Sequence, residues 1–432
     1  MQKTETTTVL PGVQFEYIPA LDYKNASFAV GFKYKCKRGR SSADTVLAHL
    51  LFRSSEDYPT YALFSRRLEE LYATDLSAQS LRQGDFRAAL FQATFLDEPF
   101  AREIPDFTRA VLSVLSGAIL RPALSSDGLF CSDAVEREKE TLLDRVRSIK
   151  NSKSAYTHER LCALVADPRR YDLPDYGNEE EIAAVTPKTL MERYRGMLYR
   201  SEVVFVYAGS LPKETVLGLI RELFGKLLFL RRPLRGKVCM PRLSSHSPVL
   251  RVSEQTDGEQ AMLGLAYRMP AGFGEEGVKC LPMLTAVLSD APMSLLFSEV
   301  RERGGYCYSI RAIVKPASRN LFILCGIAPG TETSVERAVS RVLTEVRTGK
   351  TDPSLLQAGR TYLQMTLTSI WESVDATVNF VLSRRLFGRR IDPELLLREA
   401  EAITADDLSS FMKKVRPDAV FLLAPKGGGQ RG

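Results

Sequence analysis

Alternating apolar and polar positions mark the first strand of the chain. The segment FAVGFKYKCK at 28–37 places Phe32, Tyr34 and Cys36 on one face and three lysines on the other. A period of two residues predicts a half-buried β-strand. An apolar helix carrying VLAHLLF at 46–52 follows, so the chain opens with a strand and then a helix.

The second half of the chain shows the same order of patterns. The run AMLGLAYRM at 261–269 predicts a strand, and VKCLPMLTAVLSD at 278–290 predicts the helix after it. The runs YSIRAIV at 308–314 and LFILCGI at 321–327 are typical of paired strands, with PASRN between them as the turn.

The ends of the two halves also correspond. A helix that starts after Thr186 is followed by the strand-like VVFVYAG at 203–209, and one that starts after Thr404 is followed by AVFLLAP at 419–425. Each threonine is a good N-cap, because its hydroxyl can accept a backbone N–H of the first helical turn. The two threonines lie about half a chain length apart, which indicates an internal repeat.

Strand pairs separated by helices favour an α+β fold over a doubly wound parallel sheet. We expect two similar domains, each a mainly antiparallel β-sheet packed with α-helices. The first spans residues 1–228 and the second 247–432. Pro, Gly and Arg accumulate between them, so 229–246 is expected to be a linker.

Composition excludes several classes of protein. With 44% hydrophobic and 26% charged residues, the 432-residue chain has the composition of a soluble globular protein. No apolar run reaches the ~18 residues of a membrane helix, and the start resembles no signal peptide, so we expect a cytoplasmic protein with no membrane partner. The net charge of +7 is modest for this length, and no nucleic-acid partner is expected. Seven scattered cysteines without a C-x-x-C pair are expected to be buried free thiols.

The histidines offer little metal chemistry. Only His49, His158 and His246 are present, and no two lie within one helical turn. A local pair that grips a metal from one helix face is therefore absent. On residue chemistry alone, His49 is either the remnant of a metal site or an ordinary residue of an apolar helix.

The segment SLLFSEVRERGGYCYSI at 294–310 carries the most informative chemistry. An apolar helix ends at Gly304 and Gly305, and an aromatic strand follows. Arg301 and Tyr308 together supply several donors for a peptide carbonyl or an oxyanion. Two bland interpretations stay open: Arg301 neutralising the helix C-terminus, and Tyr308 belonging to the core.

The stretch LLFSEVRERGGYCYS resembles the C-terminal segment of the pitrilysin/insulinase-like peptidases (family M16), L-F-x-E-V-R-E-x-x-G-x-x-Y-S. The resemblance implies a chain built from duplicated α+β domains. It also implies that Arg301 and Tyr308 bind the backbone of a substrate peptide. In that family the pair serves an active site whose zinc lies on a different half or a different subunit.

The zinc-binding part of that family is an H-x-x-E-H helix. The segment AHLLFRSSEDYP here resembles the sequence E-H-M-L-F-K-G-T-x-x-Y-P, which begins at the glutamate of that motif. His49 then takes the place of the second histidine, Thr45 that of the first, and Ala48 that of the glutamate that activates water. The segment EREKETLLDRV at 136–146 resembles the helix of the third ligand, whose position holds Arg145. A catalytic zinc needs three protein ligands and a base, so the resemblance implies no zinc and no other cofactor in this chain.

Bacterial two-chain members of the family divide the work between a zinc-bearing chain and one that supplies arginine and tyrosine. The resemblance implies a chain of the second kind: a non-catalytic subunit that forms half of a clamshell chamber around unfolded peptide and serves the zinc site of a partner with an intact H-x-x-E-H motif. The alternative is a non-proteolytic peptide-binding or scaffold homologue, as a homodimer or otherwise. An active peptidase with unusual ligands is a third, weaker hypothesis.

Overall fold

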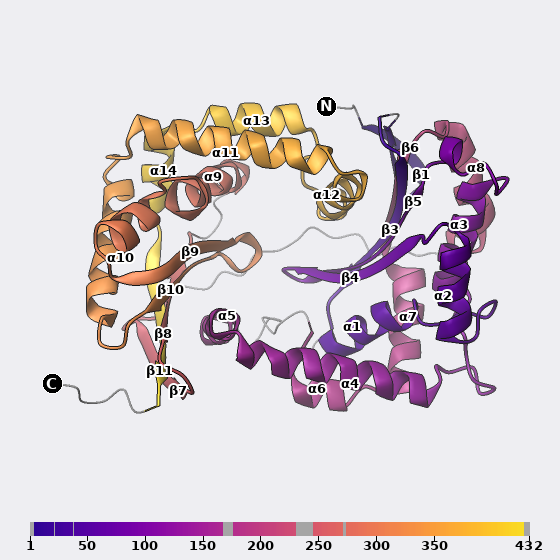
Figure 1. Cartoon of the computed structure of the whole chain (residues 1–432), viewed down its shortest axis with the longest axis horizontal. Helices are drawn as coiled ribbons and strands as arrows, with labels where there is room; N and C mark the ends of the chain where they lie inside the picture. Colours follow the sequence, from indigo (N-terminus) through magenta and orange to yellow (C-terminus); the bar gives the residue numbers. More distant parts are fainter. Residues whose placement is uncertain are drawn as a thin grey trace. The chain divides into compact units, whose positions relative to one another are not determined.

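The computed structural model describes residues 4–20, 22–37, 39–166, 176–229, 245–270 and 274–426. The chain forms two compact units, each with one β-sheet and its own helices (Figure 1). Unit 1 comprises Met1–Val146, Pro174–Val238 and Ser369–Pro393, and unit 2 comprises Arg147–Leu173, Cys239–Thr368 and Glu394–Gly432.

The sheet of unit 1 has six strands. Across the sheet they run β1 (Glu5–Leu10), β2 (Val13–Pro19), β6 (Glu202–Gly209), β3 (Asn25–Lys35), β5 (Phe86–Leu96) and β4 (Asp75–Gln83). The sheet of unit 2 has five, in the order β7 (Leu250–Thr256), β11 (Arg416–Pro425), β8 (Ala261–Arg268), β10 (Asn320–Ile327) and β9 (Cys307–Lys315).

The two sheets repeat one pattern of pairing. In each, a single parallel pair, β2 with β6 or β7 with β11, is followed by antiparallel neighbours to the far edge. The strands predicted at 308–314 and 321–327 pair antiparallel as expected. The α+β fold with two mainly antiparallel sheets is confirmed, and β1 is an addition to the first sheet.

Helices connect and cover the strands. In unit 1, or leading out of it, they are α1 (Ser41–Leu50), α2 (Tyr61–Glu70), α3 (Phe107–Leu120), α4 (Ser132–Ser148), α6 (Glu179–Ala183), α7 (Pro187–Arg200), α8 (Lys213–Phe229) and α12 (Val374–Leu386). In unit 2, or leading out of it, they are α5 (Lys153–Leu164), α9 (Gly274–Thr285), α10 (Glu332–Arg347), α11 (Pro353–Trp371), α13 (Pro393–Glu401) and α14 (Ala405–Met412). Short 3₁₀ helices lie at Glu98–Phe100, Ile149–Asn151 and Pro316–Ser318, and π-helical turns at Ala286–Asp290 and Phe297–Glu302.

The repeated threonines cap their helices as the sequence predicted. Thr186 accepts the Thr189 N–H at 3.2 Å, and Thr404 accepts the Asp407 N–H at 3.2 Å. In both cases the backbone N–H of the cap donates to a side-chain oxygen of the third helical residue, which completes a capping box. The strands β6 and β11 follow these two helices.

Each unit contains one helix that belongs to the other half of the sequence. Helix α12 packs on β3 and β6 in unit 1, where Val378, Val381 and Leu382 join Val204 and Val206 in one buried cluster. Helix α5 packs on β8 and β11 in unit 2, through residues that include Leu161. The units therefore differ from the division expected at 229–246, and residues 230–244 of that linker lie outside the described residues.

This exchange explains why the first predicted strand is more buried than its pattern indicated. Strand β3 is buried at every position except its two ends, so the expectation of a half-buried strand is wrong. Helix α12 covers its second face. Lys33 is therefore only 6% exposed, and its ammonium pairs with Glu202 at 2.6 Å. A buried lysine without such a carboxylate would be costly.

A glycine stands where each exchanged helix approaches its sheet. Gly31 lies in VGFKY and Gly264 in the similar LGLAY of the second half. A Cβ on Gly31 would lie 2.4 Å from Leu386 Cδ1 and 3.0 Å from Leu382 Cδ1, both on α12. A Cβ on Gly264 would lie 2.5 Å from Leu161 Cδ1 on α5. The repeated glycine therefore lets each helix pack closely on the central strand.

Replacing Gly31 by alanine should lower the free energy of unfolding of unit 1 by roughly 1–3 kcal/mol, because buried leucines surround the new methyl group. The single tryptophan, Trp371, belongs to the cluster under α12, so its fluorescence during urea unfolding reports this unit. Gly218→Ala in α8 is the matched control: its Cβ meets nothing within 4 Å and should be neutral or slightly stabilising. Equal stability of the two variants would contradict the close packing.

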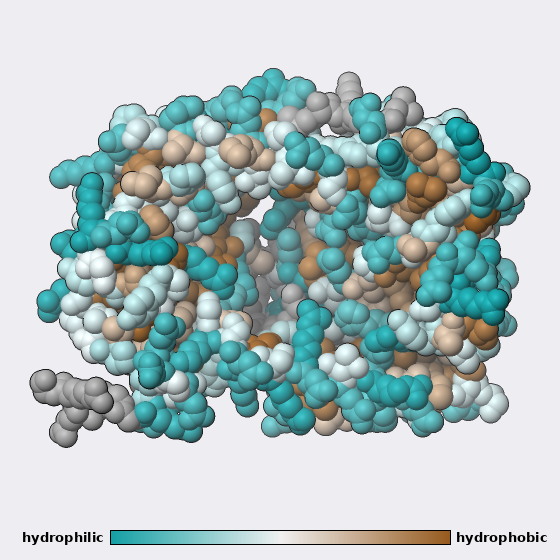
Figure 2. All heavy atoms as spheres, in the orientation of Figure 1, coloured by the Kyte–Doolittle hydropathy of each residue, from teal (hydrophilic) through white to brown (hydrophobic). Residues whose placement is uncertain are grey.

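Hydrophilic side chains cover much of the visible surface of each unit (Figure 2). Among the described residues, no helix combines the length and the apolar character needed to cross a membrane.

Candidate functional site

The first candidate group lies on α1, and two of its positions, Thr45 and Ala48, are buried and offer no metal ligand. Thr45 is 7% exposed and its hydroxyl donates to the Ser41 carbonyl at 3.2 Å. Ala48 is 1% exposed and has no polar side chain. His49, in the last turn of the helix, is half-buried and is the one ionisable residue of the three.

Burial and three charged neighbours set the pKa of His49. Burial lowers the pKa of His49, the carboxylate of Glu138 opposes this, and Arg145 and Arg53 lower the pKa further. The imidazole is therefore neutral at pH 7. Glu138 and Arg145 lie seven residues apart on α4, which places them on the same face of the helix.

Sequence reasoning missed two members of this group, Glu138 and Arg53. Glu138 is 6% exposed, and its carboxylate pairs with the Arg53 guanidinium at 2.5 Å. The signal was present in the spacing, because a residue two helical turns before Arg145 must share its face. The acidic residue that raises the pKa of His49 is therefore already half of an ion pair.

These residues do not fit a zinc ion. Zinc in a catalytic site is held by three protein ligands with an open fourth position, but this group offers one imidazole and one carboxylate that is already paired. The charges of Arg53 and Arg145 would repel a cation. Over the described part of the chain, no cluster of three His, Cys, Asp or Glu side chains could hold a metal.

The second candidate group begins in a π-helical turn. The sequence predicted a helix that stops at the double glycine, and residues Phe297–Glu302 form a π-helix in which the Arg303 N–H donates to the Ser298 carbonyl at 2.9 Å. Such turns are rare and occur often at functional sites. Gly305 adopts φ +60°, and its N–H donates to the Arg301 carbonyl at 3.0 Å. This bond fixes the backbone of Arg301 at the end of the helix.

Arg301 and Tyr308 both present their polar groups to solvent. Tyr308, on β9, is 59% exposed and is therefore not a core residue. The Arg301 guanidinium lies over the Phe297 ring, 4.9 Å from its centroid, and its nearest carboxylate, on Glu302, is 4.0 Å away. Neither side chain makes a hydrogen bond to another described residue. Arg303 differs, because it pairs with Glu299 at 2.5 Å.

The two groups belong to different units. Thr45, Ala48, His49 and Arg145 are in unit 1, whereas Arg301 and Tyr308 are in unit 2. The donors of unit 2 therefore make a group of their own, defined by β9 and the π-helical turn before it.

The other histidines have structural surroundings. His158, on α5, packs edge-on against Phe322 with 5.2 Å between ring centroids, and burial followed by the charges of Lys315 and Arg311 lowers its pKa to about 4. The Nδ1 atom of His246 lies 2.7 Å from an oxygen of the buried Asp418. Six cysteines of the described residues are thiols outside any disulfide. Cys36, Cys280, Cys307 and Cys325 are buried as expected, whereas the expected burial is wrong for the half-buried Cys162 and the exposed Cys131. Cys239 lies outside the described residues.

Comparison with known proteins shows which peptidases the chain is similar to. Residues 184–361 match the family model of the peptidase M16 inactive domain. A probable inactive metalloprotease of Bacillus subtilis, YmfF, is 21% identical over 88% of each chain. The chain is therefore similar to the M16 peptidases, and residues 184–361 are similar to their inactive domain. An uncharacterized zinc protease of Mycobacterium tuberculosis is 23% identical over 97% of this chain and 93% of its own.

Solved structures agree with the fold of this M16 homologue. A conserved protein of Enterococcus faecalis superposes with a TM-score of 0.86 at 20% identity, over 98% of this chain and 99% of its own. A peptidase M16 inactive domain of Pseudomonas fluorescens superposes with a TM-score of 0.79 at 14% identity, over 98% of both chains. The resemblance first seen at residues 294–310 thus extends over nearly the whole chain.

Proposed function

We propose that this M16 homologue is the non-catalytic subunit of a two-chain zinc peptidase. It forms half of the chamber that receives an unfolded peptide, and its partner is a chain with an intact H-x-x-E-H motif that carries the zinc. Arg301 and Tyr308 of this chain bind the backbone of the peptide at the partner's zinc site.

The observation that supports this proposal most is the state of the Arg301 and Tyr308 donors. Both side chains are exposed, and no described residue takes up their hydrogen-bonding groups. A donor held ready in this way can bind a carbonyl oxygen without first breaking a bond to the protein. The backbone of Arg301 is fixed by Gly305, which limits the reorganisation needed on binding.

The group around His49 supports the same proposal, because it shows what this chain lacks. With His49 beside an Arg53–Glu138 pair and Arg145, this chain lacks the ligands and the base to activate water by itself. A retained pair of peptide donors in such a chain is explained if another chain supplies the metal.

Reconstitution tests the proposal. The chain is purified alone, a chain of the same organism with an intact H-x-x-E-H motif is purified alone, and hydrolysis of an unfolded peptide is measured for each and for their mixture. We expect hydrolysis by the mixture only. A partner that is equally active alone, or stoichiometric zinc and hydrolysis in this chain alone, would overturn the proposal. Failure of the two chains to associate would favour the non-proteolytic scaffold.

A further inference from the structure

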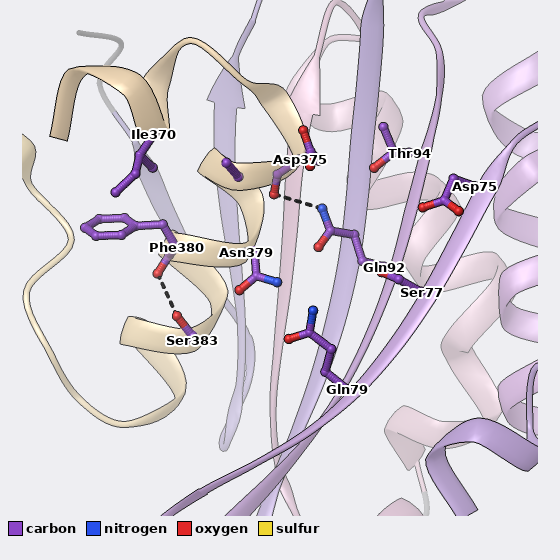
Figure 3. A pocket seen from close by; sticks show the side chains of 11 residues that line it. Asp75, Ser77, Gln79, Gln92, Thr94, Ile370, Asp375, Asn379, Phe380 and Ser383 are labelled. Atoms are coloured by element: carbon purple, nitrogen blue, oxygen red, sulfur yellow. Dashed lines mark hydrogen bonds between the residues drawn. The ribbon is translucent and has the colours of Figure 1, made fainter. Parts of the chain in front are cut away.

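Unit 1 contains a polar pocket that the proposed function does not use. It has a volume of about 450 Å³ and lies between β4 and β5 on one side and α12 with the end of α11 on the other (Figure 3). Asp75, Ser77 and Gln79 alternate along β4, so their side chains share the face of the sheet that lines the pocket. Asn379 points into it from α12, whereas Phe380 lines its rim with a ring that is turned away from β4 and β5 (Figure 3).

Gln92 is a buried residue in the wall of the pocket, and its side-chain oxygen can accept a hydrogen bond from a ligand. Its side chain, 7% exposed in the folded chain, donates from Nε2 to Ser27 Oγ at 2.9 Å and to the Asp375 carbonyl at 2.9 Å. A backbone carbonyl only accepts, so the orientation of the amide is fixed. The Oε1 atom has no hydrogen-bond partner among the described residues, and it points toward Asn379 across the pocket (Figure 3).

The remaining lining favours a cation with an apolar stem. Asp75 and Asp375 bring two carboxylates, and none of the described residues that line the pocket is a lysine, arginine or histidine. Ile370 and Phe380 supply apolar surface. The guanidinium of Arg384 lies 5.0 Å from the centroid of the Phe380 ring, so one face of this ring is already occupied by a planar cation.

We propose that this pocket binds the guanidinium of an arginine side chain in an extended peptide. The guanidinium donates to Gln92 Oε1 and to the carboxylates of Asp75 and Asp375, and the methylene stem packs on Ile370 and Phe380. The five N–H donors of the planar guanidinium match these acceptors, and the methylene stem matches the apolar walls. The inference rests on the proposed function only in taking a peptide as the carrier of the arginine.

Binding to the isolated full-length chain tests the inference without a partner and without hydrolysis. A short peptide with a single arginine is compared with the same peptide carrying citrulline, which has the shape of arginine but no charge. Calorimetry measures both, and the fluorescence of Trp371, next to the lining residue Ile370, follows the titration. We expect the arginine peptide to bind roughly 10-fold more tightly than the citrulline peptide, as one lost charge-assisted bond would require.

Variants assign this preference to the pocket. Asp75→Asn combined with Asp375→Asn should remove most of the preference for arginine, whereas Asp133→Asn, an exposed aspartate on α4, should leave it unchanged. Equal affinity for the two peptides, or equal loss in the control variant, would overturn the inference. Binding of agmatine as tight as that of the peptide would show that the pocket takes a free guanidinium compound and would overturn the peptide carrier. Loss of hydrolysis in the two-chain assay with this preference intact would count against the proposed function alone.

Discussion

Replacing Arg301 by alanine should reduce peptide hydrolysis by the reconstituted two-chain enzyme by roughly 10²-fold or more, the loss typical of an oxyanion donor. The guanidinium is exposed and makes no hydrogen bond to a described residue, so its removal disturbs little of the folded chain. Its contribution comes when a carbonyl oxygen gains charge during the reaction. The decrease should therefore appear in kcat as well as in kcat/KM.

Two further variants distinguish a specific role of Arg301 and Tyr308 from a general effect of positive charge on this surface. Arg303→Ala removes a guanidinium two residues away that is 76% exposed and paired with Glu299, and it should leave hydrolysis nearly unchanged. Tyr308→Phe removes only a hydroxyl and should lower hydrolysis with no change in stability, because the ring is 59% exposed. Equal turnover of Arg301→Ala and the unsubstituted chain would end the proposal that Arg301 serves the partner's zinc site.

The internal repeat was predictable because its signals are local. Threonine caps, β-branched runs and the double glycine act within a few residues of themselves, and both capping boxes and the end of the helix at Gly305 follow from them. The exchange of α5 and α12 was not predictable in this way. It depends on packing between α12 and β3, which are separated by most of the chain.

The same limit applies to the candidate group around His49. The resemblance to the M16 motif named Thr45, Ala48 and Arg145, because short motifs can be aligned within single helices. The Arg53–Glu138 pair could not be expected, since it joins a turn to a helix more than eighty residues away and is set by tertiary packing. The pocket at Gln92 was missed for the same reason, as its walls come from β4, β5 and α12.

Replacing Asp44 by asparagine should lower the free energy of unfolding of unit 1 by about 3–5 kcal/mol, the cost of removing one partner from a buried ion pair. Asp44 lies on α1, is 2% exposed, and binds Arg193 of α7 through two hydrogen bonds of 2.7 and 3.0 Å. Arg87 of β5, with a side chain 1% exposed, lies 3.5 Å from the same carboxylate. Burial is the largest single influence and lowers the pKa of Arg193, but the charge and hydrogen bonds of Asp44, together with Tyr34 and Cys36, outweigh it and raise the pKa.

Asparagine keeps the shape of Asp44 but removes the negative charge that faces the buried guanidinium groups of Arg193 and Arg87. A typical domain has only about 5–15 kcal/mol of stability to lose. Asp57→Asn is the matched control. It also removes a carboxylate from an arginine, Arg121, but the side chains are 50% and 40% exposed, so the expected loss is at most about 1 kcal/mol. Urea unfolding followed by Trp371 fluorescence compares the two. Losses of equal size would show that burial does not set the strength of the Asp44 pair, because the chemical change is the same in both variants.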